Sequence, residues 1–281
     1  MCTVIVGFDP AASTPLVLAA LRDEMADRAW ERPAAHWPEH PDLVGGRDTR
    51  EGGTWLAARR PGAAGPPRVA ALLNGVLPSG RHPQWGPAPG SAPPAGTSVP
   101  SGTARFSRGR LPLAAARSGA FDLDESEARH YDPFHLLVAG ADRAVLHSWD
   151  GSALREQALP AGTTVLVNSG CDAEEPRARR HGPVFARTRP DPPPSRLAAA
   201  DTVDGIWGAW RGLLDEAARG DARTGGTGTG TDDPSSLIAR FRLGERVWAT
   251  SSVTLAACGR DTLRYAFTAR PGEPAGWYLV R

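Results

Sequence analysis

Short apolar runs, each closed by a polar or turn-forming cluster, constrain the fold of this chain more than any other feature. Runs of this kind bounded by Gly, Pro and Asp are typical of β-strands. Four of them occur within the first 75 residues, at positions 3–8, 16–21, 54–59 and 68–73. Six more follow, at positions 134–139, 143–148, 163–167, 247–257, 263–268 and 277–280. The sequence therefore predicts a protein built on two groups of strands.

Helical periodicity is rarer. In residues 203–218 apolar side chains recur at intervals of three and four, which predicts an amphipathic helix, and residues 108–118 predict a shorter one. Segments 83–103 and 220–234 are rich in small, turn-forming residues and lack periodicity, so we expect flexible insertions there. We predict a single α+β domain spanning all 281 residues, with stacked sheets and helices on the outside.

Composition removes several classes of function. All 32 side-chain cations are arginines, which excludes a P-loop and any lysine nucleophile or base. The formal charge is +1 with both signs interspersed, which disfavours nucleic-acid binding by a basic face. No apolar run approaches the roughly 18 residues of a membrane span, and the start is not typical of a secretory signal. We expect a cytoplasmic protein with no nucleic-acid partner and no membrane span; the oligomeric state stays open.

The three cysteines bear on both compartment and chemistry. Cys2, Cys171 and Cys258 are odd in number and widely spaced, which predicts free thiols in a reducing compartment and no metal site. Removal of Met1 would give Cys2 a free α-amine beside its thiol. With an ordinary pKa of about 7.7–8.0, that amine can accept the thiol proton near neutral pH. The alternative is that Cys2 is a small apolar residue at the head of a buried strand.

Polar residues at the ends of three apolar runs are further candidates. Arg22 and Asp23 follow the second run, where an aspartate can bind an α-ammonium and an arginine can favour a thiolate; a solvated charged turn is the alternative. Asn74 and Asn168, the only asparagines of the chain, end two other runs. A side-chain amide there can donate to a developing oxyanion, whereas Asn-Gly and Asn-Ser are also common turn dipeptides.

Several of these residues lie in short segments that belong together. Those of the first 75 residues are Met1-Cys2-Thr3, Phe8-Asp9-Pro10, Ala-Leu-Arg-Asp-Glu at 20–24, Glu51-Gly52-Gly53-Thr54-Trp55-Leu56 and Ala71-Leu72-Leu73-Asn74. Their order and spacing resemble the Asn-Arg-Asp-Glu (NRDE) family, also called the transport and Golgi organisation protein 2 family. The segments at 131–137 and 165–169 extend the resemblance, and residues 250–255 look like the closing strand of that family.

The resemblance implies a fold similar to the N-terminal-nucleophile (Ntn) hydrolases, a four-layer α-β-β-α sandwich, as in penicillin V acylases and bile salt hydrolases. It implies roles for five residues: Cys2 as nucleophile, Arg22 and Asp23 ordering its thiol and amine, Asn74 as oxyanion donor and Asn168 as a second amide. Trp55 is expected to pack against this region, as a substrate contact or as a core aromatic. No cofactor and no metal is expected for this chemistry.

Two departures from the family pattern stand beside this resemblance. The asparagine of the name motif is Leu21 here, which removes a polar contact beside the expected pocket. The arginine that the family often shows near its closing strand is missing from residues 250–252, which argues against a charged, carboxylate-bearing substrate. Either departure implies an altered specificity or a lost reaction.

Three functions are compatible with these residues. The first is a cysteine amidohydrolase or acyltransferase that acts on a small-molecule amide through Cys2. The second, implied by the resemblance, is a non-catalytic protein that binds or traffics haem or an acyl lipid. The third is a degenerate Ntn scaffold that serves protein interaction.

Overall fold

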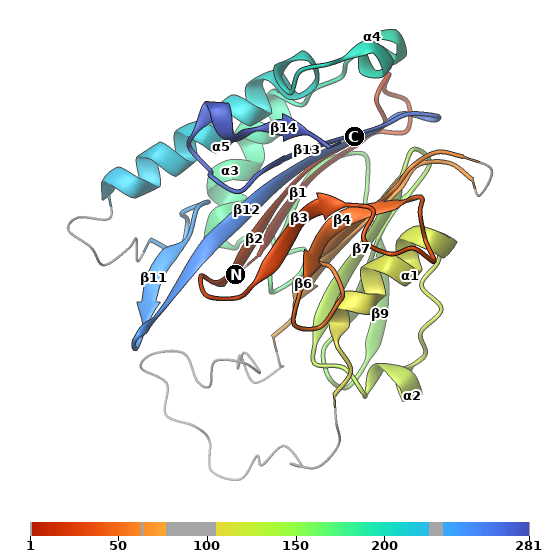
Figure 1. The fold of residues 1–281 in the computed structure, drawn as a ribbon, viewed down its shortest axis with the longest axis vertical. Helices are drawn as coiled ribbons and strands as arrows, with labels where there is room; N and C mark the ends of the chain where they lie inside the picture. Colours follow the sequence, from red (N-terminus) through yellow and green to blue (C-terminus); the bar gives the residue numbers. More distant parts are fainter. Residues whose placement is uncertain (1, 63–64, 77–104, 225–232, 281) are drawn as a thin grey trace.

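The computed structural model describes residues 2–62, 65–76, 105–224 and 233–280. Two antiparallel seven-stranded sheets form its centre, with helices outside them (Figure 1). The predicted insertion at 83–103 lies outside the described residues, as does most of the one at 220–234. Within the described ranges, no helix combines the length and the apolar character needed to cross a membrane.

The first sheet, sheet A, joins the two ends of the chain. In spatial order it contains β10 (Gly162–Leu166), β1 (Thr3–Phe8), β2 (Leu16–Met25), β12 (Arg246–Cys258), β13 (Leu263–Thr268) and β14 (Tyr278–Leu279), with β11 (Arg240–Leu243) paired to β12. All six residues of β1 are buried, because this strand lies inside the sheet and both faces of the sheet are covered. The end of β2 therefore pairs with β12 from the far end of the sequence, and the start of β1 pairs with β2 on the other side.

The second sheet, sheet B, is a meander whose strands follow one another in sequence and in space. They are β3 (Trp30–Ala34), β4 (Leu43–Asp48), β5 (Leu56–Arg59), β6 (Arg68–Asn74), β7 (Phe134–Gly140), β8 (Ala144–Trp149) and β9 (Leu154–Ala158). Asn74 is the last residue of β6 and pairs with Phe134 on β7.

Helices lie on the outer face of each sheet. Those on sheet A are α3 (Pro176–Arg187), α4 (Pro194–Ala199) and α5 (Asp204–Thr224). Those on sheet B are α1 (Leu111–Ser118), which follows the 3₁₀ turn η1 (Arg108–Arg110), and α2 (Glu125–Ala128). A second 3₁₀ turn, η3 (Pro274–Gly276), precedes β14.

Three apolar clusters separate the layers. One contains residues of both sheets, such as Val4, Leu18, Leu73 and Leu146, and fills the space between them. The second joins sheet A to its helices, and the third joins sheet B to α1 and α2. Because each sheet buries both faces, the layers run helix, sheet A, sheet B, helix (Figure 1). The α+β class with two stacked sheets is confirmed.

The four strands predicted before residue 75 are present as β1, β2, β5 and β6, but two more strands of this region were missed. The missed strands are β3, which contains a proline and is mostly exposed, and β4, whose Gly45-Gly46 pair suggests a turn. Both glycines are there for close packing: a Cβ on Gly45 would lie 2.4 Å from the Leu56 carbonyl oxygen, and one on Gly46 would lie 2.2 Å from the Trp55 ring. The helix predicted over 203–218 begins at Asp204, is kinked at Gly208, where φ is 38° and ψ is −105°, and continues to Thr224.

Strands β9 and β11 and helices α2, α3 and α4 were not predicted either. Strand β9 has mostly exposed side chains and therefore lacks an apolar run. Helix α3 has a sequence rich in arginine that includes Gly182 and Pro183, and it buries few side chains. Its start does carry a helix signal, because Glu175 accepts hydrogen bonds from the first backbone N–H groups and Pro176 occupies the first turn.

Candidate active site

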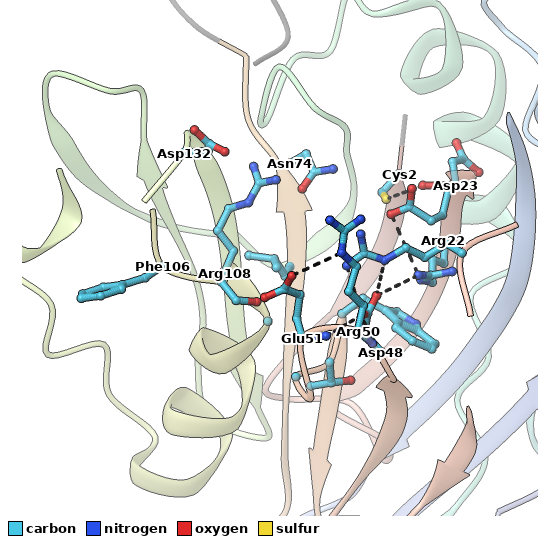
Figure 2. A pocket seen from close by; sticks show the side chains of 18 of the residues that line it. Cys2, Arg22, Asp23, Asp48, Arg50, Glu51, Asn74, Phe106, Arg108 and Asp132 are labelled. Carbon is cyan, nitrogen blue, oxygen red and sulfur yellow. Dashed lines mark hydrogen bonds and ion pairs between the residues drawn. The ribbon is translucent and has the colours of Figure 1, made fainter. Parts of the chain in front are cut away.

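Residues from both sheets line a cavity of about 370 Å³, a volume typical of small-ligand sites (Figure 2). Sheet A contributes Cys2, just before β1, and Arg22 from β2. Sheet B contributes Asn74 from the end of β6, and Trp55 lies just before β5. The cavity thus brings together residues that are more than 70 positions apart in the sequence.

Cys2 is half-buried at the wall of this cavity. Its thiol donates to the backbone carbonyl oxygen of Asp23, with 3.7 Å between the sulfur and the oxygen. Burial raises the pKa of this thiol and the charge of Asp23 adds to the rise, while Arg22 opposes it. Near neutral pH the thiol is therefore protonated and needs a base before it can act as a nucleophile. Cys171 is exposed and Cys258 is buried, and both are free thiols like Cys2.

Arg22 is fixed on the sheet B side of β2. Its Nη1 donates to Ser251 Oγ at 2.9 Å, and its Nη2 lies 3.6 Å from Asp48 Oδ2. The guanidinium lies over the ring of Trp55, 4.4 Å from the ring centroid, an arrangement that favours the cation. Burial lowers the pKa of Arg22, and the charges of Glu24, Cys2 and Asp48 oppose that shift, so the cation persists. Trp55 lines the cavity and supports Arg22 at the same time.

The carboxylate of Asp23 is held by contacts that the cavity wall does not provide. Thr250 Oγ1 on β12 donates to Oδ1 at 2.6 Å, and Arg177 Nη1 on α3 donates to Oδ2 at 3.3 Å. The same Arg177 nitrogen donates to Thr3 Oγ1 at 2.9 Å. Both Asp23 and Arg177 are buried, so the carboxylate is part of a closed ion pair on the helix-facing side of sheet A.

Arg177 is the principal residue that sequence reasoning missed. It lies in the charged stretch Glu174-Glu175-Pro176-Arg177, which gives no sign that one of its arginines is only 4% exposed. The helix-start signal at Glu175 and Pro176 could have located α3, but not the partner of Arg177. That partner lies 154 positions away and is decided by packing.

The two asparagines have different surroundings. Asn74 lines the cavity, whereas Asn168 is 2% exposed and is not among the cavity-lining residues. The register that pairs Val4 with Leu166 sets the positions of Cys2 and Asn168 opposite each other two residues further on. Within the described part of the chain, Asn168 Oδ1 is buried without a hydrogen-bond partner. Asn168 therefore lies across the β1–β10 pair from Cys2 and outside the cavity wall, whereas Asn74 is part of that wall.

His135 fixes the backbone at Asn168. Its Nε2 lies 3.1 Å from the Asn168 carbonyl oxygen, which can only accept, so Nε2 carries the proton. Its Nδ1 then accepts from Ser148 Oγ at 2.7 Å. Burial lowers the pKa of His135, which keeps the ring neutral. A neutral histidine with this tautomer stabilises the turn that follows β10.

Leu21 lies elsewhere than expected. It packs in the apolar cluster between sheet A and its helices, paired in register with Thr3 and Val253. Successive side chains of a strand point to opposite faces, so Leu21 faces the helices while Arg22 faces the cavity. The expectation that Leu21 removes a polar contact beside the pocket was therefore wrong.

The family model for Transport and Golgi organisation 2 matches residues 1–188 of this chain. The chain belongs to this family. The predicted resemblance is confirmed over the segments between residues 1 and 169, and the one at residues 250–255 lies beyond the matched region. No curated protein matches the chain.

All described residues that line the cavity fall within the Transport and Golgi organisation 2 region. Cys2, Arg22 and Asn74 are among them, and Arg177, which does not line the cavity, also falls within residues 1–188. Thr250 and Ser251 on β12 do not, although they hydrogen-bond to Asp23 and Arg22. Strand β12 therefore completes the surroundings of the family residues from outside the matched region.

Proposed function

We propose that the protein is an Ntn-type cysteine amidohydrolase or acyltransferase acting on a small amide, with Cys2 as nucleophile after removal of Met1. The observation that carries this proposal is the convergence in one cavity of a thiol, an arginine beside it and a side-chain amide from the opposite sheet. Acyl transfer needs a nucleophile, a base and an oxyanion donor within reach of one carbonyl group.

The base is the α-amine of Cys2. Among the described residues that line the cavity there is no histidine, and the chain has no lysine. The carboxylate of Asp23 already accepts hydrogen bonds from Arg177 and Thr250. An amine on the same residue as the thiol is close to it by covalent structure, and its ordinary pKa of about 7.7–8.0 suits proton transfer near neutral pH.

The reaction proceeds in two halves. The α-amine takes the thiol proton, the Cys2 sulfur bonds to the amide carbon, and the carbonyl electrons move to an oxygen that accepts from the Asn74 amide. The C–N bond then breaks, and the leaving amine takes the proton from the α-ammonium. Water, or another acceptor in an acyltransferase, attacks the thioester, its proton passes to the α-amine, and the Cys2 sulfur leaves. Arg22 favours the thiolate at both stages.

The haem-binding alternative gains no support from the cavity. Of the described residues that line it, arginine and acidic side chains form much of the wall and none is a histidine. Haem requires a largely apolar pocket and an axial ligand, which is most often His, Met or a thiolate. The thiol of Cys2 has a raised pKa and is protonated. These residues therefore do not fit haem, and the scaffold alternative has no specific contact in its favour.

A cysteine-reactive acylating probe tests the enzyme proposal. Intact-mass measurement first establishes whether Met1 is removed. We expect the probe to label Cys2 in the wild type and the label to be lost in Cys2→Ala. Because Cys171 is exposed and would react non-specifically, the comparison is made in a Cys171→Ala background. Cys258 needs no such control, since burial raises its pKa to about 12.

Turnover gives the second readout. With an amide found by screening acyl amides, we expect Cys2→Ser and Cys2→Ala to lose most activity and Cys171→Ala to retain it. Unchanged turnover by Cys2→Ser would exclude Cys2 as the nucleophile. Retention of Met1 in a fully active protein would exclude the α-amine of Cys2 as the base.

A further inference from the structure

Arg108 lines the cavity that contains Cys2, and the fold fixes its position. It lies in η1, whose neighbouring Gly109 carbonyl accepts from Thr54 N at 2.9 Å. The backbones touch closely at this point, because a Cβ on Gly53 would lie 2.5 Å from the carbonyl carbon of Gly109. This contact attaches η1 to the segment that also carries Trp55.

The guanidinium of Arg108 lies near the candidate oxyanion donor. Its Nη1 donates to the carbonyl oxygen of Pro133 at 2.8 Å. The same carbonyl accepts from the backbone N–H of Gly75, the residue after Asn74. Figure 2 shows the side chain of Arg108 pointing toward Asn74. The guanidinium of Arg108 and the backbone of the residue after Asn74 therefore share one carbonyl acceptor, which places a positive charge near the amide expected to bind the oxyanion.

Arg108 differs from the other arginines of the cavity. Arg22 and Arg28 lie within 4.0 Å of Asp48, Arg50 within that distance of Glu51, and Arg105 within that distance of Asp132. Arg108 has no carboxylate within 4.0 Å in the described part of the chain. Its remaining guanidinium nitrogens make no hydrogen bond within that part and are not sealed from solvent.

The charges around Arg108 maintain it as a cation. Burial lowers the pKa of Arg108, while the charges of Asp132, Cys2 and Glu24 oppose that shift. An arginine stays protonated in proteins despite such a shift. An unpaired, partly desolvated guanidinium with free N–H groups binds a carboxylate or phosphate better than any neutral group.

We propose that Arg108 binds an anionic group of the substrate, so that the preferred substrates are amides carrying a carboxylate or a phosphate near the scissile bond. This inference rests on the proposed acyl-transfer function. The proposal places the contact with the anionic group in η1. The closing strand, where the family often has an arginine, contains none at residues 250–252. Arg108 acts on specificity, because it is placed to contact the substrate group beside Asn74 and not the sulfur of Cys2.

Paired substrates test the assignment. The kcat/KM is measured for N-acyl amino acids, for the corresponding neutral N-methyl amides and for phosphorylated analogues, with wild type and Arg108→Gln. We expect wild type to prefer one charged series, and Arg108→Gln to reduce the preference over the neutral series by about 10- to 100-fold. Which charged series loses more distinguishes a carboxylate from a phosphate.

The matched control is Arg110→Gln. Arg110 ends the same 3₁₀ turn, is exposed and does not line the cavity, so the substrate preference should stay that of wild type. An equal loss for charged and neutral substrates in Arg108→Gln would assign Arg108 to the oxyanion and overturn the inference. Melting temperatures of both variants identify a folding defect.

A binding measurement separates this inference from the enzyme proposal. Isothermal titration with phenylacetate and with inorganic phosphate should show weaker anion binding in Arg108→Gln than in Arg110→Gln. If the wild type hydrolyses no amide and Arg108→Gln still weakens binding, the anion site stands and the enzyme proposal fails. If amides are hydrolysed but neither binding nor preference changes in Arg108→Gln, the anion site fails and the enzyme proposal stands.

Discussion

The two faces of β2 beside Cys2 differ in the charged residue that each presents and in its surroundings. On the face toward sheet B, Arg22 lies against an open cavity with Asp48, Ser251 and the Trp55 ring as partners. On the face toward the helices, Asp23 is sealed with Arg177. Adjacent residues of one strand thus contribute to a cavity on one face of the sheet and to a buried ion pair on the other.

The difference separates the consequences of substitution. A buried ion pair broken on one side leaves an uncompensated charge and destabilises the fold. A half-buried residue on the cavity wall, such as Asn74, retains access to water, so its loss affects chemistry more than stability. Substitutions on the helix-facing side should therefore lower the free energy of unfolding, and substitutions on the cavity side should lower kcat. Substitutions of Arg177, of the two asparagines and of His135 test this separation, from the largest expected effect to the smallest.

Arg177→Leu tests the helix-facing side. It removes a guanidinium from the buried carboxylate of Asp23 and from Thr3 Oγ1, and we expect the free energy of unfolding to fall by about 3–5 kcal/mol. Urea denaturation at neutral pH measures the change. Arg246→Gln, which removes the exposed pair with Asp27, is the control and should have a much smaller effect. Similar losses in the two variants would contradict the distinction between buried and exposed pairs.

The two asparagines test the cavity side. Asn74→Ala should lower kcat by about 10²- to 10³-fold if this amide binds the oxyanion, with little change in stability. Asn168→Ala should lower kcat less, because Asn168 lies outside the cavity wall. Kinetics and thermal unfolding of both variants check this. The reverse order would place the oxyanion on the Asn168 side of Cys2.

His135→Gln tests the turn that carries Asn168, and its effect depends on pH. Burial lowers the pKa of His135, so the folded chain binds fewer protons there than the unfolded chain, whose histidine titrates near about 6.5. Stability should fall as the pH drops below that value and level off below the folded-state pKa. The glutamine cannot titrate, and His147, whose pKa burial also lowers, is present in both proteins.

The observable is the wild-type free energy of unfolding minus that of His135→Gln. It should decrease as the pH is lowered from about 8 to about 5. A difference independent of pH would mean that His135 does not change its protonation between the folded and unfolded states.

The strands with apolar runs were predictable because their pattern is local. Residues 3–8 coincide with β1, and the runs at 134–139 and 263–268 lie at β7 and β13. Strands β3, β4 and β9 were missed because they bury few apolar side chains or contain glycines needed for close packing. The grouping of Cys2, Arg22, Asp23 and Asn74 was predicted by the family resemblance. The structure places all four around one cavity, with the carbonyl oxygen of Asp23 at the Cys2 thiol and its carboxylate paired with Arg177.

The sequence by itself determined the α+β class, most of the strands and the chemistry available: thiols, arginines, two asparagines and no lysine. Tertiary structure alone decided that Asp23 pairs with Arg177 and that Leu21 faces the helices. It also decided that Asn168 lies across the β1–β10 pair from Cys2, and that Arg108 lines the cavity without a carboxylate partner among the described residues. The physical reason is the sequence distance over which each feature is determined. Apolar periodicity is set by neighbouring residues, whereas the partner of a buried charge depends on strand register and layer packing across more than a hundred positions.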